Sequence, residues 1–480
     1  MMRPCPLTIL IAFSAIAAGQ ETQPEIIPAG YRLETVPTPP GVEFAVGGIA
    51  FHPNGDTWCC TRHGEVWKLH DGAWSLFAEG LHEALGLNID PQTAQVFVLQ
   101  RGELTELIDE NHDGSCDFFR TVNADWGYSG NYHCYAFGLP RDSRGNFYGT
   151  LNLAHSNEGA VGGSIMGADA KYRGWSFQVT PDGIFTPWSS GLRSPCGIGI
   201  NRHDELFYTD NQGDWNATNA LYHVLKGRFH GHPSSLKDDP QFKGKDLNAL
   251  TPEDYARLRT PPAVWLPYHL GQSAGEPVFN ESGGKFGPFE DQVFIGDQTR
   301  NTLLRVSLEK VGGEYQGCVF PFVNRTQCGI IRAKFDRNGV LWLGQSGRGW
   351  GSAGGKQFGL QKILWDGKTI PFEIKAVSLL PDGFSITFTK PAASDSVRPD
   401  RLTMEHFHYR YSGQYGSPDL DRTPVTPASV TLSADGLIVT AKVPPVPDKI
   451  WTLRFADSVK SATGEPLANR EASYTLNRLR

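Results

Sequence analysis

The sequence predicts an all-β protein, a six-bladed β-propeller followed by an immunoglobulin-like β-sandwich. The chain has 480 residues, of which 54 are glycine and 33 are proline. This composition suits many short strands joined by tight turns. One hairpin pattern recurs six times, and near residue 371 it gives way to simply alternating strands. We therefore expect the propeller over residues 31–368 and the sandwich over 371–480.

Each copy of the recurring pattern is a small or apolar pair, a turn with Pro, Asp, Asn or Gly, and three or four strand-forming residues. Such stretches predict β-hairpins. Their uneven spacing, with further strand-like runs between them, favours propeller blades with loop insertions. The alternative is an array of β-sandwiches whose Asp-Gly turns are alike by chance. The six copies are residues 49–60, 87–100, 137–152, 198–211, 278–297 and 333–345.

The last hundred residues read as antiparallel strands. The stretch ADGLIVTAKV (434–443) alternates apolar and polar residues with period two, as a half-buried strand does. Similar runs lie at 373–380, 383–389 and 449–456. They fit a sandwich of the immunoglobulin type. One helix is expected at 250–259, inside a long insertion, where Thr-Pro-Glu forms its cap.

The N-terminus predicts a signal peptide over residues 1–19. Arg3 supplies a basic start, an apolar run follows from Leu7 to Ile16, and small residues at 17–19 form a cleavage zone. The alternative is a buried first helix. We expect a secreted or periplasmic protein without a membrane span, because no other run has membrane length. The net charge of −7 argues against nucleic acid or an anionic membrane as a partner.

Export would permit disulfides, and seven cysteines follow the signal peptide. Cys318 and Cys328 flank a short apolar loop and form the expected pair. Cys59 and Cys60 are adjacent, and two buried thiols are favoured there over a vicinal disulfide. No C-x-x-C-H motif for haem attachment occurs, and no C-x-x-C pair of the zinc type.

The segment DENHDGSCD (109–117) has the oxygen-rich spacing of a calcium loop. Gly114 permits the sharp turn, whereas Arg120 stands where a full EF-hand has its bidentate glutamate. We expect a structural calcium ion, with a solvated acidic turn as the alternative. The candidate ligands are Asp109, Asn111, Asp113, Ser115 and Asp117.

Three further motifs resemble functional ones but are not assigned those functions. Ser273 in GQSAG (271–275) fits a nucleophile elbow only if a helix follows, and the next residues cannot start one. The glycine-rich segment 347–357 lacks P-loop spacing. His230 and His232 lie in a Gly-Pro turn without a nearby carboxylate, which is more often structural than metal-binding.

His133, in SGNYHCYAFGLP (129–140), precedes a strand that begins a repeat. In a propeller the loops entering such strands converge on the mouth of the central channel. Histidine titrates near neutral pH, so at that place it can act as a general base. The alternative is a hydrogen-bonded structural histidine.

Two segments resemble the soluble PQQ-dependent glucose and sorbosone dehydrogenases. They are YHCYAFGLPRDSRGNFYGTLN (132–152) and GLRSPCGIGINRHDELFYTDNQGDWNATNALYHVLKGRFHGHP (191–233). A general likeness in the sequence pattern extends over about residues 46–365, but only these two segments are specific to the family. It implies a six-bladed propeller that oxidises a sugar with PQQ and calcium. A separate electron acceptor, such as a cytochrome, is then expected.

The resemblance also assigns roles to residues. His133 matches the base that takes the sugar hydroxyl proton, and Arg193 the arginine that stabilises charge on the reducing quinone. Gly213 matches a glycine whose carbonyl holds calcium, while Asp214 stands in place of the following proline. The family grips its tricarboxylate cofactor with a lysine and two arginines. The candidates at or near those places are Thr299, Arg300, Arg332 and Arg348.

The sequence therefore predicts a sugar or sugar-alcohol dehydrogenase using PQQ and calcium. A non-catalytic propeller that binds carbohydrate or protein is one alternative, and the altered cofactor grips favour it. A lactonase-like hydrolase with a metal ion at the mouth is the other.

Overall fold

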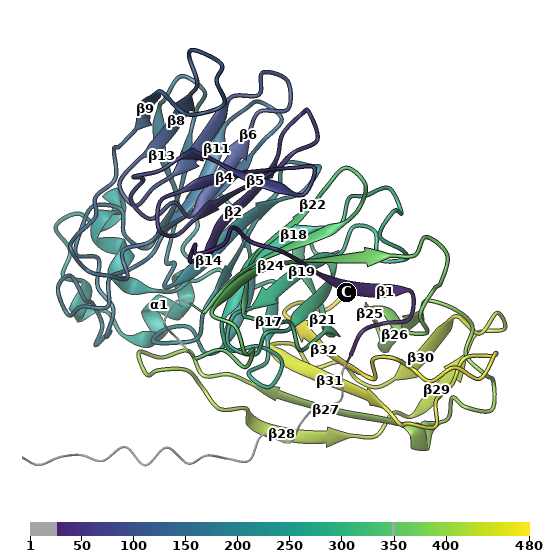
Figure 1. The fold of residues 1–480 in the computed structure, drawn as a ribbon. Helices are drawn as coiled ribbons and strands as arrows, with labels where there is room; N and C mark the ends of the chain where they lie inside the picture. The colour runs from purple at the N-terminus through teal and green to yellow at the C-terminus, as the bar shows by residue number, and fades with distance from the viewer. Residues whose placement is uncertain (1–25, 348–350) are drawn as a thin grey trace, which may run out of the picture.

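The computed structural model describes residues 26–347 and 351–480, and in this part the protein is almost entirely β (Figure 1). The predicted signal peptide (1–19) and Arg348 lie outside the described residues. All six predicted hairpins are confirmed, each as the first two antiparallel strands of a sheet.

The first three sheets contain four strands each and follow one another along the chain. The first consists of β2 (Val46–Phe51), β3 (Thr57–Thr61), β4 (Val66–His70) and β5 (Ala73–Ala78). The second consists of β6 (Gly86–Ile89), β7 (Val96–Leu99), β8 (Leu104–Ile108) and β9 (Phe118–Asn123). The third consists of β10 (Ala136–Arg141), β11 (Phe147–Leu151), β12 (Trp175–Val179) and β13 (Phe185–Ser190).

The next three sheets continue the pattern, and the last of them includes the first strand of the chain. The fourth consists of β14 (Pro195–Ile200), β15 (Leu206–Asp210), β16 (Asn219–Val224) and β17 (Val264–Leu266). The fifth begins with β18 (Ala274–Phe279), β19 (Val293–Asp297), β20 (Leu303–Val311) and β21 (Glu314–Val323). The sixth consists of β22 (Ile330–Phe335), β23 (Leu341–Ser346), β24 (Phe358–Trp365) and β1 (Tyr31–Val36).

The first strands of these sheets pack against one another in a closed cycle, from β2 through β6, β10, β14, β18 and β22 back to β2. Glycines permit the close approach. A Cβ atom on Gly199 would lie 2.2 Å from the carbonyl oxygen of Pro277, so no larger residue fits there. β1 pairs with β24 over Tyr31↔Trp365 to Val36↔Leu360, which joins the N-terminal strand to the last sheet. We call the end of this ring at which the six first strands begin the mouth.

Residues after 371 form two further four-stranded arrays. One sheet has the order β25 (Ile374–Leu380), β26 (Gly383–Phe388), β30 (Ile438–Lys442) and β29 (Ser429–Leu432). The other, β32 (Glu471–Leu476), β31 (Lys449–Phe455), β27 (Leu402–His408) and β28 (Leu420–Val425), continues the fifth sheet through β21. Their apolar faces share one core, to which Phe384, Trp451 and Tyr474 contribute.

A buried ion pair links this C-terminal region to the ring. Nη2 of Arg305 on β20 lies 3.1 Å from Oε2 of Glu373, and both side chains are fully buried. The same guanidinium donates to the carbonyl oxygens of Ile374 and Lys375 and packs against Phe289. The contact fixes the start of the C-terminal region against the fifth sheet.

The helix predicted at 250–259 is confirmed as α1 (Pro252–Leu258), with a capping box between Thr251 and Asp254. It lies in the insertion between β16 and β17, with short 3₁₀ turns at Pro233–Asp238, Pro240–Phe242 and Leu247–Ala249; another lies at Pro399–Arg401. Among the described residues no helix has both the length and the apolar character needed to cross a membrane.

The predicted Cys318–Cys328 disulfide is wrong, because both cysteines are free and buried. Cys318 lies in the middle of β21, where it pairs with Ser307 and Tyr474. β21 runs on to Val323 in extended conformation, which at about 3.3 Å per residue carries the chain far from Cys318. The expectation of two buried thiols at Cys59 and Cys60 is confirmed.

Candidate functional site

The mouth is built on buried carboxylates at the ends of second strands. Asp210, the last residue of β15, accepts hydrogen bonds from the backbone N–H groups of Arg193 (2.8 Å) and Ser194 (2.7 Å). It also accepts one from the N–H of Asn211 at 2.9 Å. One side chain thus ties the loop entering β14 to the loop leaving β15.

The neighbouring sheet repeats this device with Asp297, the last residue of β19. Its carboxylate accepts from the N–H groups of Gln272, Ser273 and Arg300, each at 2.7 Å. Ser273 precedes strand β18, so the helix that a nucleophile elbow needs after its serine does not follow here. Burial raises the pKa of both Asp210 and Asp297 to about 6, although the N–H donors act in the opposite direction.

His133 lies in the loop ahead of β10, beside the turn that Asp210 holds at Arg193 and Ser194. Its Nδ1 lies 2.7 Å from the carbonyl oxygen of Leu153, which only accepts, so Nδ1 carries the proton. Nε2 is then the basic nitrogen of the neutral ring, and it lies 3.2 Å from Oγ of Ser194. The sequence-predicted base and the residue after Arg193 are therefore in contact.

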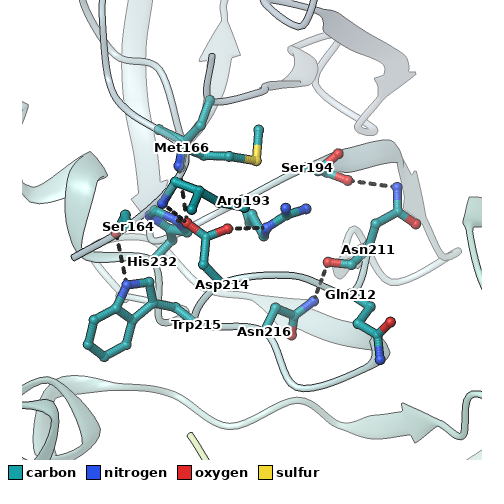
Figure 2. Close-up of polar contacts among 12 residues, drawn as sticks. Ser164, Met166, Arg193, Ser194, Asn211, Gln212, Asp214, Trp215, Asn216 and His232 are labelled. Carbon is teal, nitrogen blue, oxygen red and sulfur yellow. Dashed lines mark hydrogen bonds and ion pairs between the residues drawn. The ribbon is translucent and has the colours of Figure 1, made fainter. Parts of the chain in front are cut away.

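Arg193, the other predicted catalytic residue, forms a buried ion pair. Its Nε lies 2.7 Å from Oδ1 of Asp214, and these side chains are 8% and 0% exposed. The second carboxylate oxygen accepts from the backbone N–H of Ile165 (2.8 Å) and Met166 (3.1 Å) and from Nε2 of His232 (3.1 Å). Figure 2 shows Asp214 between Arg193 and His232, with the terminal guanidinium nitrogens directed away from the carboxylate, towards the side of Ser194.

The charges of this group follow from its hydrogen bonds. Burial lowers the pKa of His232, which outweighs the effect of Asp214. Its Nδ1 accepts from the N–H of Ser234, so neutral His232 donates to Asp214 through Nε2. Burial would raise the pKa of Asp214, but the His232 bond and the Arg193 charge hold it well below its usual range. Asp214 is therefore the counter-ion of Arg193.

Gly213 lies directly against this arginine. A Cβ atom there would fall 1.9 Å from Cζ of Arg193, so glycine is needed for the guanidinium to pass. The Gly213 carbonyl oxygen accepts from the N–H of Asn216 at 3.2 Å and of Gly416 at 3.0 Å. Two donors of the protein thus already occupy the carbonyl that the resemblance assigns to calcium.

The residues predicted to bind the carboxylates of the cofactor do not form one cluster. Arg332 is 1% exposed and donates to the carbonyl oxygens of Gly47, Leu85, Cys196 and Ile331, inside the ring. It joins loops and strands of four sheets.

The other grip candidates lie around Asp297. The carbonyl oxygen of Thr299 accepts from the N–H of Ala353 at 2.8 Å. Arg300 has its guanidinium 5.7 Å from the ring centre of Tyr268, and its Nε is buried without a hydrogen-bond partner among the described residues. Arg300 is thus a candidate carboxylate-binding residue whose guanidinium still has an unused N–H donor among the described residues.

The resemblance implies PQQ and calcium, and these residues do not fit that pair in the family's manner. The calcium position has Asp214 instead of proline, and its remaining carbonyl is already bonded. Arg193 is neutralised by Asp214, and Arg332 is committed to backbone carbonyls. A tricarboxylate needs several uncommitted cations, because each charge-assisted contact contributes about 1.5–3 kcal/mol.

The predicted calcium loop lies apart from the mouth, between β8 and β9. Its oxygens bind backbone N–H groups within the loop: Asp109 accepts from Gly114 (2.9 Å) and Asp113 from Ser115 (2.8 Å). The ammonium of Lys68 donates to the Gly114 carbonyl. Oδ1 of Asp109 is buried without a hydrogen-bond partner among the described residues.

Asn111 and Asp117 complete this loop. Nδ2 of Asn111 lies 3.1 Å from Oδ2 of Asp113 and 3.2 Å from Oδ1 of Asp117. The other oxygen of Asp117 accepts from the N–H of Glu110 at 2.8 Å. The turn is therefore folded on its own hydrogen bonds.

His230 and His232 play different structural parts. His230 is buried against the edges of the Tyr208 and Tyr222 rings, and burial lowers its pKa to about 3. Across the described residues, no group of three or more His, Cys, Asp or Glu side chains is arranged to hold a metal ion.

Ser194, Asp210 and the segment that borders Gly213 from the C-terminal region were not predicted from the sequence. Asp210 and Asp297 end equivalent strands of two repeats, in FYTD and FIGD, and this recurrence was the available signal. Gly416 lies some two hundred residues from Gly213 and carries no local signal.

The fold is shared with solved β-propeller structures. An oxidoreductase described as a glucose dehydrogenase from Thermus thermophilus has a TM-score of 0.51 and 19% identity, covering 70% of this chain and 100% of its own. The holo form of the pyranose dehydrogenase PQQ domain from Coprinopsis cinerea has a TM-score of 0.51 and 12% identity, with coverages of 71% and 98%. At such identities the likeness concerns the fold.

Residues 70–317, more than half of the chain, match a protein family described as a domain of unknown function, DUF7133. The chain belongs to this family. No curated protein matches the sequence.

Proposed function

We propose that the protein is a carbohydrate-oxidising propeller enzyme that binds a sugar hydroxyl at the mouth, between His133 and Arg193. The observation that carries the proposal is the orientation of His133. Its Nδ1–H is held by the Leu153 carbonyl, so Nε2 is the basic atom, and it meets the Ser194 hydroxyl at 3.2 Å. A sugar hydroxyl that takes the place of that hydroxyl donates its proton to Nε2.

Arg193 supports this chemistry electrostatically. Asp214 holds the guanidinium by Nε, which directs its terminal nitrogens to the side of Ser194 (Figure 2). Donors fixed in this way stabilise the negative charge that develops on the sugar oxygen as its proton leaves. Asp210 positions Arg193 and Ser194, because its carboxylate accepts hydrogen bonds from the backbone N–H groups of both residues.

The oxidation itself needs an electron acceptor. The similar structures are described as a glucose dehydrogenase and as the PQQ domain of a pyranose dehydrogenase, and this supports a sugar or sugar alcohol as substrate. The calcium hairpin and the residues at the tricarboxylate positions do not fit PQQ, so the proposed reaction contains no step on PQQ. The reaction removes a hydride from the sugar carbon as well as the hydroxyl proton, so a two-electron acceptor of the quinone class bound at the mouth would have to take the hydride. Its electrons would then leave to a separate protein such as a cytochrome, since the chain has no haem-attachment motif.

A second candidate function is a non-catalytic carbohydrate-binding propeller. The ion pair between Arg193 and Asp214 and the bonded Gly213 carbonyl favour it, because they occupy the places of cofactor contacts. The metal-dependent lactonase has less support, since the described residues offer no cluster of metal-ligating side chains.

The organisation of the chain belongs to the same proposal. The closed cycle of six first strands supports a six-bladed propeller over residues 31–368. The two arrays around one core support an immunoglobulin-like sandwich over 371–480. Export to the periplasm or medium rests on the sequence of residues 1–19.

The test measures dye reduction by the purified protein over a panel of aldoses and sugar alcohols, first without added cofactor and then after titration with PQQ in calcium buffer. A catalytic site predicts sugar-dependent reduction that His133→Ala abolishes and His203→Ala, at an exposed histidine, leaves intact. Sugar binding without dye reduction would support the non-catalytic alternative. Absence of both would contradict the proposed function.

A further inference from the structure

The segment between β27 and β28 crosses from the C-terminal region to the mouth. Residues 411–417 run beside residues 212–217 and are fastened to them by backbone hydrogen bonds. The N–H of Trp215 donates to the Ser412 carbonyl at 2.9 Å, and that of Gly416 to the Gly213 carbonyl at 3.0 Å. The N–H of Ser417 donates to the Ala217 carbonyl at 2.9 Å.

Side-chain contacts also hold the same segment. The ring of Tyr411 packs 5.1 Å from that of Trp215, between centres, and its hydroxyl donates to the Gly231 carbonyl. The guanidinium of Arg259 lies 4.4 Å above the Tyr411 ring. In Figure 1 the light-green chain beyond β27 and β28 extends towards the insertion that carries α1. The segment is therefore fixed in position.

One side chain of this fixed segment remains in solvent. Tyr415 is bridged to Asp214 through the backbone, yet its side chain makes the residue 64% exposed. This is the largest exposed fraction among the large apolar residues of the described chain. A rigid backbone that presents an uncovered ring next to buried polar groups is typical of a binding surface.

The ring lies beside the groups of the mouth. The guanidinium carbon of Arg193 is 5.4 Å from the centre of the Tyr415 ring. Two more exposed apolar side chains border the same network. Tyr132, 45% exposed, precedes His133, and Ile165, 41% exposed, has its N–H bonded to Asp214.

We infer that Tyr415 is a sugar-binding residue, so that the ligand site is made jointly by the ring of six sheets and the C-terminal region. The inference rests on the proposed function. A pyranose has an apolar face of C–H groups and a rim of hydroxyls. Its apolar face packs on an uncovered aromatic ring while its hydroxyls meet charged and polar donors. Tyr415 provides the aromatic surface and Arg193 the polar donors, and the tyrosine side chain stays exposed until the sugar covers it.

The test is calorimetric titration of the full chain with glucose, galactose, mannose, xylose, glucuronate, cellobiose and maltose. For the sugar that binds best, Tyr415→Ala is expected to weaken affinity about tenfold, because the stacking contact is lost. Tyr415→Phe keeps the ring and should stay within about twofold of the wild type. Phe118→Ala, at an aromatic residue of similar exposure (52%) on β9, is the matched control and should bind as the wild type does.

The outcomes separate the inference from the function it rests on. If the wild type binds a sugar and Tyr415→Ala binds it equally well, the inference is overturned while the proposed function stands. If the wild type binds no sugar of the panel, both are overturned. Thermal melting of each variant verifies folding, and Tyr415→Phe provides the readout should Tyr415→Ala unfold.

Discussion

The carboxylate of Asp214 lies 2.7 Å from Nε of Arg193, and both residues are buried at the mouth. This pair decides what the mouth offers a ligand. It fixes the guanidinium, cancels its net charge, and occupies the place where the resemblance implied a calcium hairpin. A neutral but strongly polar site suits an uncharged polyhydroxylated ligand.

The ion pair also matters for stability. Asp214→Ala would leave the Arg193 cation buried without its counter-ion, which typically costs about 3–5 kcal/mol. Urea denaturation of the wild type and variant measures the difference. The double variant Arg193→Met/Asp214→Ala should recover part of the loss, because no unpaired charge then remains. Equal stability of wild type and Asp214→Ala would show that the pair is not closed in solution.

Asp210 predicts a pH dependence of stability. Its pKa is about 6 in the folded protein, above its ordinary 3.8, because of burial. The folded state therefore holds a proton that the unfolded state releases as the pH rises from about 4 to 6. The free energy of unfolding falls over this interval, by about 3 kcal/mol for a shift of about two units.

Asparagine at position 210 cannot ionise, so Asp210→Asn should gain stability relative to the wild type as the pH rises. Denaturant melts at pH 4, 5, 6 and 7 measure this trend. Asp204→Asn, at an exposed turn residue, is the control and should follow the wild type. A difference between Asp210→Asn and wild type that stays constant across these pH values would contradict the buried, proton-binding carboxyl.

Arg332 is predicted to be structural. Arg332→Met would remove the donors to four buried carbonyl groups, and we expect a loss of at least about 3 kcal/mol in unfolding free energy. Arg337→Met, at an exposed arginine near the end of the same strand, should change stability by about 0.5 kcal/mol or less. A stable Arg332→Met with impaired ligand binding would instead indicate that Arg332 is a ligand grip.

The calcium site that the sequence predicts at Asp109 stays a prediction, because the loop is folded on its own hydrogen bonds. A calcium concentration about a hundredfold above the dissociation constant would add about 2.7 kcal/mol. Thermal melting in calcium and in EDTA measures the effect, and Asp113→Asn should reduce it. If calcium leaves the melting temperature of the wild type unchanged, the loop is a self-bonded acidic turn in which Lys68 supplies the positive charge.

The parts of the fold that follow local rules were predictable. The six hairpins depend on turn residues and short apolar runs that neighbour each other in sequence, and all six are present. The pairing of β1 with β24 was not predicted, because Tyr31 and Trp365 are joined across the whole ring. β27 and β28 were also missed, since LTMEHFH and LDRTPV lack a clean period of two. β32 was missed although EASYTL alternates polar and apolar residues.

The site was predictable only in part. His133 was selected from its place before a strand that begins a repeat, and Arg193 through the resemblance; the structure brings Ser194, the neighbour of Arg193, onto His133. The roles of these residues stay predictions. The pairing of Asp214 with Arg193 had no signal, because a carboxylate in a turn reads as a solvated group unless its burial is known. Cys318 and Cys328 were paired on sequence proximity alone, and the extended β21 separates them.

The proposed function requires a sugar hydroxyl to meet Nε2 of His133. The most direct measurement is nitrogen NMR of protein labelled with ¹⁵N-histidine, with the His133 signals assigned by comparison with His133→Gln. On addition of the best-binding sugar, we expect the His133 Nε2 resonance to shift while that of exposed His203 stays in place. An unchanged His133 resonance under saturating sugar would show that no sugar hydroxyl meets this nitrogen.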